Sequence, residues 1–400
     1  MPFSLTARTG HPDFLDLPWD RPLADWEHER LVEVPSGLHR HVVRFVSYEQ
    51  GLYVLKELPR RYAEREYRFL RHLADEGVPV VTVVGVASQR SDATGELLQA
   101  VLITQHLRYS LPYRLLFARR PARELRDPMM DALVHLLVRV HLAGFMWGDC
   151  SLSNTLFRRD AGRLAAYVVD TETGELHVEL TDGQRGYDVE TAIERCAGEL
   201  FDLQAQGLLA PDVDPAELGD ELRDRYGQLW DELTREEVFG PEERYRIHHR
   251  LERINDLGYD VGELELTGDE PGGSAVRMRL HVVEPGRPAR LLKERTGIDA
   301  QDEQARRLLS DIASFGAWLA SEEGREFPPP VVAGRWLERS WEQTLAAVPA
   351  ELRGRREDPQ LFIEILDHWH WLSENQGRDM ALTDAADDFA HWVLANEPDD

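Results

Sequence analysis

The chain has 400 residues with 46 basic and 73 acidic side chains, a formal net charge of −27. This acidity repels nucleic acid and anionic membranes at long range, which argues against a nucleic-acid partner. The two cysteines are too few for a disulfide framework or a metal site. No apolar run reaches membrane-spanning length and the first 31 residues lack a signal-peptide pattern, so we expect a cytoplasmic protein.

The first predicted elements are two strands, residues 31–34 and 41–46, which form a hairpin. The turn between them contains Ser36 and Gly37, whose hydroxyl and backbone amide groups could bind a phosphate. The turn holds a single glycine, so an ordinary hairpin turn is an equally good interpretation.

The next predicted strand, residues 52–58, carries a lysine on an aliphatic face. Alternation places Lys56 on the same face as Val54, and a lysine in such surroundings needs a partner or an anionic ligand. Lys56 and Lys293 are the only lysines in a chain whose other cations are arginines. We therefore predict that Lys56 binds an anionic ligand, with Val54 beside it. The alternative is an edge-strand lysine that extends into solvent.

A helix is predicted over residues 60–76. At 100° per residue, Glu66 falls in the middle of an apolar face that includes Phe69 and Leu73. A carboxylate in that position is costly unless it is paired, so we predict that Glu66 is the partner of Lys56. A solvated glutamate on a rotated helix is the alternative.

Two more strands, residues 80–87 and 97–107, are followed by a long helix, residues 127–143, which begins at Asp127 and Pro128. This helix is followed by a loop in which the spacing of acidic and amide side chains is the strongest indication of function in the sequence.

In that loop Asp149 is followed five positions later by Asn154, and Asp170 ends the next apolar run. Kinases place a proton acceptor, a metal-binding amide and a metal-binding carboxylate at such a spacing. Asp and Asn also suit ordinary turns, which is the alternative. The phosphotransfer interpretation predicts that Asp149 orients an acceptor hydroxyl, while Asn154 and Asp170 bind Mg²⁺.

The same interpretation assigns the upstream elements to the binding of ATP. Lys56, held by Glu66, would bind the α- and β-phosphates. Residues 104–107 would form the hinge whose backbone contacts adenine, with Gln105 and His106 at its centre.

Three further helices are predicted over residues 187–203, 215–234 and 241–257, and a domain boundary within residues 255–262. Four hundred residues suit such a division.

Beyond this boundary, residues 276–283 and 289–294 are predicted to form a hairpin. A long helix over residues 300–320 follows, capped by Asp299, and three prolines at 328–330 predict a stiff connection before further helices.

Residues 31–203 resemble the kinase-like fold, in particular the bacterial lipopolysaccharide-kinase (Kdo/WaaP-like) and small-molecule kinase branches. The residues that carry this resemblance are Lys56, Glu66, the stretch 140–149, Asn154 and Asp170. Residues 264–393 resemble a bacterial domain of unknown function that is joined to such a lobe.

The resemblance implies an α+β fold with a small β-rich N-lobe, a helical C-lobe and an additional, mostly helical C-terminal domain. The expected domains are an N-terminal extension, the N-lobe, the C-lobe and the C-terminal domain, at residues 1–30, 31–107, 108–257 and 263–400.

The sequence departs from the kinase pattern in three places. Trp147 stands where His or Tyr usually supports the loop, which puts the support of the loop in question. The phosphate-covering turn lacks most of its glycines. Thr171 and Glu172 follow Asp170 in place of Phe and Gly, and Glu172 either adds a carboxylate near the metal or begins a turn.

Two functions follow from these patterns. The first is an ATP- and Mg²⁺-dependent phosphotransferase that acts on an unidentified hydroxyl acceptor, a small molecule rather than a protein. The second is a weak or silent kinase-like nucleotide-binding scaffold, or sensor, that recruits a protein partner through residues 263–400. The charged set of Lys56, Glu66, Asp149 and Asp170 favours the first; the poor phosphate cover and Trp147 favour the second.

Overall fold

The computed structural model describes residues 3–34, 41–118, 122–209, 213–243, 245–268, 276–376 and 380–396. Contacts divide the chain into two units, which we describe separately. The N-terminal unit comprises residues 1–157 and 166–227, and the C-terminal unit comprises residues 158–165 and 228–400. The domain boundary inferred from the sequence, within residues 255–262, remains a prediction.

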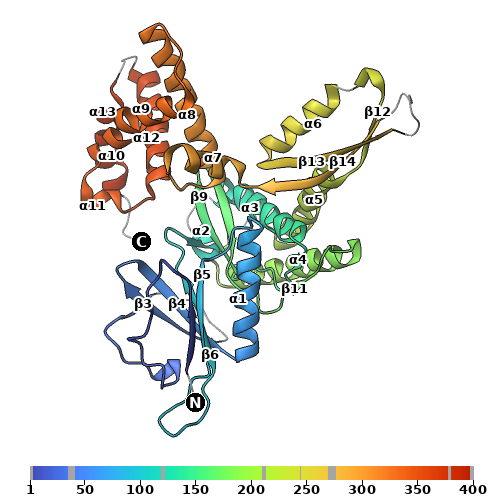
Figure 1. The fold of residues 1–400 in the computed structure, drawn as a ribbon, viewed down its shortest axis with the longest axis vertical. Coiled ribbons are helices and arrows are strands. Elements are labelled where there is room, and N and C mark those ends of the chain that lie inside the picture. The colour runs from blue at the N-terminus through green and yellow to red at the C-terminus, as the bar shows by residue number, and fades with distance from the viewer. Residues whose placement is uncertain are drawn as a thin grey trace. The chain divides into compact units, whose positions relative to one another are not determined.

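The N-terminal unit begins with a six-stranded antiparallel sheet of strand order β1-β5-β6-β4-β3-β2 (Figure 1). The expected first hairpin is present as the pair β2–β3, and the turn that holds Ser36 and Gly37 lies outside the described residues. The strands are β1 (Ser4–Ala7), β2 (Leu31–Val32), β3 (Val42–Tyr48), β4 (Gly51–Leu58), β5 (Val83–Ser88) and β6 (Ala100–Gln105).

Residues 3–30 form part of this sheet and cover one of its faces. Strand β1 pairs with β5 at the edge of the sheet. A Cβ atom at Gly85 would lie 2.3 Å from the carbonyl oxygen of Thr6, so the two strands approach closely only because residue 85 is glycine. The aromatic residues of this segment, Phe14, Trp19 and Trp26, are buried against the face formed by residues such as Leu55, Val84, Val101 and Ile103.

Helix α1 (Arg60–Asp75) packs on the opposite face of the sheet (Figure 1). Its apolar side chains Ala63 and Leu70 join Leu58, Val83 and Leu102 in one buried cluster. The sheet therefore has an apolar cover on both sides, which leaves Glu66 on a face of α1 that is otherwise buried against it.

The rest of the N-terminal unit is mainly helical. Its helices are α2 (Tyr113–Ala118), α3 (Ala122–Leu142), α4 (Asp182–Ala205) and the greater part of α5 (Pro215–Thr234). Its short strands are β7 (Leu111–Pro112), β8 (Phe145–Met146) and β11 (Glu175–Leu176), and it shares β9 (Thr155–Asp160) and β10 (Arg163–Val168) with the C-terminal unit.

The predicted start of the long helix at Asp127 and Pro128 is wrong, because α3 already runs from Ala122 and contains Pro128 in its interior. Proline removes one backbone hydrogen bond. The buried residues that follow, such as Met129 and Leu133, give the helix enough packing to continue through that position. Helix α4 also begins earlier than expected, because Thr181 and Gln184 form a capping box.

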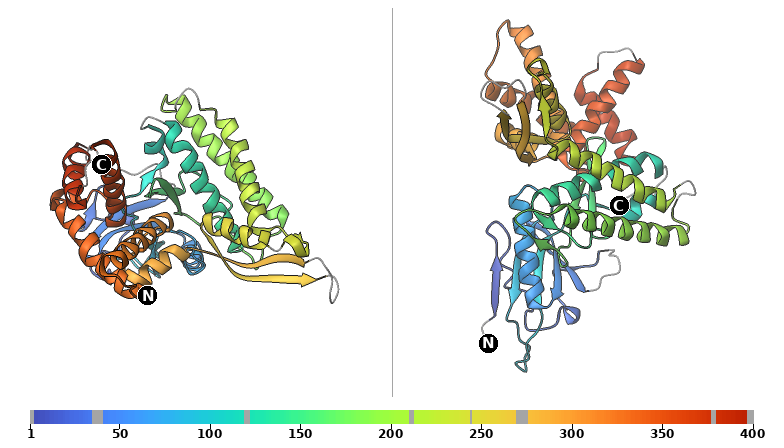
Figure 2. Two further views of the ribbon diagram at one scale, coloured as in Figure 1. Left: turned by 90° about the horizontal axis from the view of Figure 1, so that it is seen from above. Right: turned by 90° about the vertical axis from the view of Figure 1, so that its right-hand side faces the viewer.

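The C-terminal unit contains a three-stranded sheet, β12-β14-β13, and Figure 2 shows β13 and β14 as a long paired ribbon. Its elements up to this ribbon are β12 (Glu237–Phe239), α6 (Tyr245–Asp256), β13 (Tyr259–Gly268) and β14 (Val276–Pro285).

The predicted hairpin of residues 276–283 and 289–294 is wrong. Strand β14 pairs with β13, and the second segment lies in helix α7 (Arg287–Thr296). Gly286 and Gly297 flank this helix with φ values of 81° and 77°, and Pro288 occupies its first turn. Left-handed glycines and a proline in the first turn are signals of helix ends, and they outweigh the short apolar run inside the segment.

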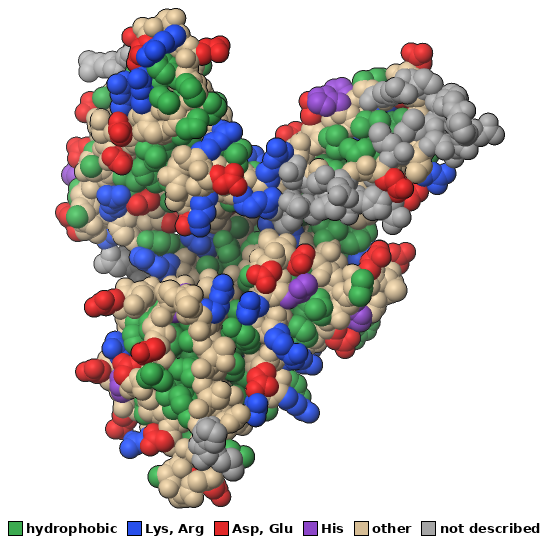
Figure 3. All heavy atoms as spheres, viewed as in Figure 1, with side chains coloured by type: hydrophobic (Ala, Val, Ile, Leu, Met, Phe, Trp, Pro, Cys, Tyr) green, Lys and Arg blue, Asp and Glu red, His purple; other side chains and the backbone are tan. Residues whose placement is uncertain are grey.

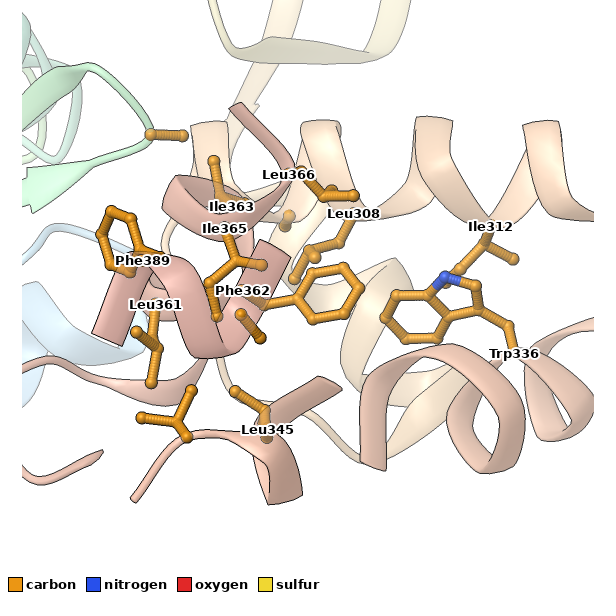
Figure 4. Packing of buried hydrophobic residues seen from close by; sticks show 14 of the residues in the cluster. Leu308, Ile312, Trp336, Leu345, Leu361, Phe362, Ile363, Ile365, Leu366 and Phe389 are labelled. Atoms are coloured by element: carbon orange, nitrogen blue, oxygen red, sulfur yellow. The ribbon is translucent and has the colours of Figure 1, made fainter. Parts of the chain in front are cut away.

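The remaining helices of the C-terminal unit enclose one apolar core. Figure 4 shows Trp336, Phe362 and Leu308 packed in this core. The helices are α8 (Asp302–Glu323), α9 (Pro329–Trp336), α10 (Glu342–Ala347), α11 (Ala350–Arg353), α12 (Asp358–Gln376) and α13 (Leu382–Trp392), with a π-helical turn, Leu337–Trp341, between α9 and α10.

The predicted cap at Asp299 is wrong, because the N-cap of α8 is Gln301, which forms a capping box with Gln304. Asp299 instead pairs with Lys293 at 2.6 Å. The prolines at 328–330 do not form a separate connection, since Pro328 is the N-cap of α9 and the next two prolines begin that helix.

Candidate active site

Lys56 projects from β4 between two carboxylates. Its Nζ donates to Glu66 Oε2 at 3.1 Å and to Asp170 Oδ2 at 2.6 Å. The side chain of Glu66 is 1% exposed and that of Lys56 is 16% exposed. The structure therefore brings together three residues that the sequence separates by up to 114 positions.

The electrostatics of this trio are strongly coupled. Burial raises the pKa of Glu66 to about 8, and the nearby Asp170 carboxylate adds to that rise while Lys56 opposes it. Burial alone would lower the pKa of Lys56, but the charges of Glu66 and Asp170 raise it above its ordinary value. With its side chains ionised, the trio carries excess negative charge, which a divalent cation would offset.

Asp149 and Asn154 lie in the loop that follows β8. The Asn154 side-chain amide donates to the Asp149 carbonyl oxygen at 3.0 Å and to Asp149 Oδ2 at 3.2 Å. The loop is held from α4, because the Glu199 carboxylate accepts from the amides of Leu152 and Ser153. Arg195, also on α4, places Nε 3.2 Å from Asp149 Oδ1.

A backbone hydrogen bond joins Asn154 to the residue before Asp170. The amide of Val169 donates to the carbonyl oxygen of Asn154 at 3.1 Å, so the residue before Asp170 is tied to Asn154 itself. Strands β9 and β10 are neighbours in one sheet and return the chain to this point. The backbone thus keeps Asn154 and Asp170 next to each other.

Asp188 on α4 supports the loop and was not predicted. Its Oδ2 accepts from the Trp147 amide at 2.7 Å and its Oδ1 from the Gly148 amide at 2.7 Å, while His141 Nε2 lies 3.0 Å from Oδ2. The side chain is fully buried. The sequence held a signal for it, because Asp188 lies on an apolar helical stripe with Ala192 and Cys196, the same pattern that marked Glu66.

Trp147 also supports the loop. Its indole Nε1 donates to the carbonyl oxygen of Asp170 at 2.7 Å, and its ring is fully buried. The departure from the usual His or Tyr thus does not leave the loop without support. The tryptophan connects the Asp149 loop to the backbone of Asp170.

Glu172 lies beside the trio. Its Oε2 is 2.8 Å from His41 Nε2 and 3.9 Å from Lys56 Nζ. Its amide donates to Asp170 Oδ1 at 2.8 Å, and its carbonyl oxygen accepts from Arg65. Glu172 therefore adds negative charge near Lys56 and orients the Asp170 carboxylate.

The predicted hinge is only partly available for a ligand. The amide of Gln105 donates to Thr82 and that of His106 donates to Leu52, each at 2.8 Å. Val54 lies in β4 opposite Thr104 and is half-buried. A purine here would have to use other backbone groups of residues 104–107.

The described residues hold no ready-made group of three or more His, Cys, Asp or Glu side chains that could bind a metal ion. Asn154 and Asp170 would therefore provide two protein oxygens, and phosphate and water oxygens would complete the shell. Mg²⁺ is commonly bound in this way, with few protein ligands. The donor set fits that ion.

The N-terminal unit combines a β-rich part, covered on both faces of its sheet, with a helical part. A lysine on a strand is held by a glutamate on a helix and an aspartate in a loop. These features define a kinase-like protein. Residues 47–190 match the lipopolysaccharide kinase (Kdo/WaaP) family, and residues 228–394 match DUF4032, a domain of unknown function. The expected family resemblance and the expected fold class, a kinase-like α+β fold followed by a mostly helical part, are both confirmed.

Among solved structures, the chain is similar to "WaaP in complex with acyl carrier protein" with 17% identity and a TM-score of 0.33, over 50% of this chain and 88% of that one. Among curated proteins, no match is found. No helix in the described ranges has the length and apolar character needed to cross a membrane.

Proposed function

We propose that the protein is an ATP- and Mg²⁺-dependent phosphotransferase that acts on the hydroxyl group of a small molecule. One observation carries the proposal: Lys56 is fixed between a buried glutamate and Asp170, and the residue before Asp170 is hydrogen-bonded to Asn154. Structural ion pairs can perturb pKa values as well, but here the three charges meet beside a loop with kinase spacing.

Each residue of the site has a distinct role in this proposal. Lys56 would bind the α- and β-phosphates, with Glu66 holding its ammonium in place. Asn154 and Asp170 would hold Mg²⁺, which would neutralise charge on the transferred phosphoryl group. Asp149 would orient the acceptor hydroxyl and take up its proton.

Binding requires that Lys56 exchange one partner. In the structure the Lys56 ammonium and the Asp170 carboxylate neutralise each other across a 2.6 Å contact. A magnesium-bearing triphosphate would supply a cation to Asp170 and anionic oxygens to Lys56. The Lys56 ammonium and the Asp170 carboxylate would then each still have a partner of opposite charge.

Calorimetry on the full chain with ATP, with and without Mg²⁺, tests the proposal. We expect Mg²⁺-dependent binding that is lost in Asp170→Ala and in Lys56→Ala. Lys293→Ala is the matched control, because it removes the other lysine, whose side chain is 62% exposed and pairs with Asp299. Binding that survives Lys56→Ala, or that Lys293→Ala abolishes equally, would contradict the proposal.

A silent nucleotide-binding scaffold is the second candidate. It is favoured by the ion pair of Asp149 with Arg195 and by the two hinge amides that are already bonded. Radiolabel transfer from ATP over a panel of hydroxyl acceptors separates the candidates. We expect Asp149→Asn to keep nucleotide binding and lose transfer. Binding by the wild-type protein without any turnover would select the scaffold.

A further inference from the structure

The hairpin of β9 and β10 connects the two predicted metal ligands. Strand β9 begins one residue after Asn154, and β10 ends two residues before Asp170. The ends of the hairpin belong to the N-terminal unit, but its tip, Arg158–Ala165, belongs to the C-terminal unit. Hairpin tips are usually exposed. This one carries a set of specific contacts with the helices of the C-terminal unit.

Asp160 caps the first turn of α8. Its Oδ1 accepts from the Gln304 amide at 2.8 Å and its Oδ2 from the Glu303 amide at 3.2 Å. Asp160 is 7% exposed. These donors are amides in the first turn of a 22-residue helix, which have no backbone acceptor within the helix and favour a carboxylate nearby. The helix end thus receives its carboxylate from a distant segment of the chain.

The backbone of the tip is held as well. The Arg159 carbonyl oxygen accepts from the side-chain amides of Gln301 and Gln304, at 2.7 and 3.1 Å. The Ala161 amide donates to Gln360 Oε1 at 2.9 Å. Ala161 has a φ of 51° and is buried in the same apolar cluster as Phe362 and Leu308.

Charged groups complete the attachment. Arg158 pairs with Glu357 on the segment that leads into α12, and Glu357 also accepts from the side-chain amides of Gln301 and Gln304. The network of buried, mutually bonded side chains is costly to assemble unless its members are satisfied. It therefore fixes one position of the tip relative to α8 and α12.

We propose that the C-terminal unit is a clamp on the β9–β10 hairpin that sets the spacing of Asn154 and Asp170, with Asp160 as its central positioning residue. The inference rests on the proposed function and assigns the C-terminal unit a role in it. Metal ligands act within narrow geometric limits, and groups that hold them from behind affect metal affinity strongly. Strands β9 and β10 are short, with six residues each. If the tip of the hairpin is loosened, Asn154 and Asp170 are held only by the contacts at the other end of the hairpin.

The test compares two aspartates of the C-terminal unit in the full chain, the buried Asp160 and the half-buried Asp311. Asp160→Ala removes the contact with the hairpin. Asp311→Ala is the matched control, because Asp311 lies on the same helix α8 and accepts from Trp336 Nε1 at 2.7 Å. Asp160→Asn keeps one acceptor oxygen and serves as a conservative rescue. Thermal unfolding identifies folded variants.

We expect Asp160→Ala to weaken binding of ATP in the presence of Mg²⁺ by roughly tenfold, the lower end of the effect of groups behind metal ligands. Binding of ATP without metal should change less than twofold. Asp160→Asn should recover part of the affinity, and Asp311→Ala should retain it. Amide exchange at Val168 and Val169 should accelerate in Asp160→Ala alone.

Loss of affinity in both aspartate variants alike would overturn the clamp, as would affinity within twofold of wild type in Asp160→Ala. If Asp160→Ala does not fold, Gln360→Ala takes its place, because it removes the acceptor of the Ala161 amide. A loss of affinity equal to that of Asp311→Ala, or an affinity within twofold of wild type, would again overturn the clamp. A wild-type chain that binds no nucleotide would defeat the proposed function and this inference with it. A wild-type chain that binds while Asp160→Ala is unaffected would defeat the inference alone.

Discussion

At the scale of single residues, the site is built from acidic side chains that the fold buries among apolar ones. Glu66 and Asp188 both lie on apolar helical stripes, and each is bonded by groups of the loop or strand that it faces. Burial of an unpaired carboxylate is costly, so each of these residues specifies where its partner must lie. The Asp149 loop is therefore positioned from α4, and the Lys56 ammonium is positioned from α1.

Trp147 provides a sharp test at this scale. Trp147→Phe keeps an aromatic ring, although a smaller one, and leaves the Asp170 carbonyl oxygen without its indole donor. A lost buried hydrogen bond costs about 1 to 2 kcal/mol, so we expect magnesium-dependent ATP affinity to fall by roughly five- to thirtyfold in calorimetry. Trp19→Phe is the control, since its indole donates to the Phe14 carbonyl oxygen at 2.7 Å, outside the site. Equal losses in both variants would argue against this role.

At the scale of elements, the junction between α3 and β8 depends on one glycine. Gly144 ends the helix with a φ of 70°, and a Cβ atom there would lie 2.3 Å from the His177 carbonyl oxygen. The position therefore combines a left-handed backbone with a close approach of the chain that precedes α4.

We expect Gly144→Ala to lower the free energy of unfolding by about 2 kcal/mol or more, measured by urea titration. Gly198→Ala is the control, because Gly198 lies inside α4 with nothing within 4 Å of its added Cβ atom. This second change should stabilise by up to about 1 kcal/mol, since alanine favours a helix. A neutral Gly144→Ala would show that the chain at His177 can move aside.

The cap of α8 should give stability a pH dependence. Burial raises the pKa of Asp160 to about 6, Asp302 and Glu303 add to the rise, and the amides of Gln304 and Glu303 oppose it. Because the folded chain holds this proton more tightly than the unfolded chain, the contribution to stability is complete below about pH 4 and is lost as the pH rises through 6.

Asp160→Asn removes this titration. Relative to the variant, the wild-type protein should lose up to about 3 kcal/mol of unfolding free energy between pH 4 and pH 7. Urea titrations of both proteins at each pH measure the difference. A difference that stays constant over this range would show that the carboxyl group titrates as it does in the unfolded chain.

The sequence predicted the pairing of Lys56 with Glu66 correctly and parts of the C-terminal unit poorly, for a physical reason. Lys56 and Glu66 are recognisable because a charge in an apolar pattern requires a partner, and the structure pairs them. Asp170 was recognised as a candidate from its position directly after an apolar strand. These signals are local in sequence and survive in any tertiary context.

The errors arose where tertiary contacts or end signals decide. The short apolar run at residues 289–294 suits a strand or a helix, and only its flanking glycines and proline indicated α7. The cap of α8 comes in part from Asp160, 142 positions before the first residue of that helix. No sequence pattern within the hairpin or within α8 indicates this long-range contact, so the attachment of the hairpin tip to α8 was not predictable.

At the scale of the whole molecule, many charged side chains form ion pairs, although acidic residues outnumber basic ones and leave a net charge of −27. Figure 3 shows acidic and basic side chains intermixed on the face in view. Exposed pairs of this kind add little stability each. The two units instead depend on their separate apolar cores and on buried polar contacts such as those of Asp188 in one unit and Asp160 in the other.

The edge position of β1 has a practical consequence. While Ser4–Ala7 pairs with β5, the outer hydrogen-bonding groups of that apolar strand are covered. Removal of the first ten residues would uncover Val83–Ser88, an apolar edge with no charged residue, and such edges recruit strands from other molecules. Proteolytic trimming of this segment would therefore promote self-association, even though every residue of the Asp149 loop is retained.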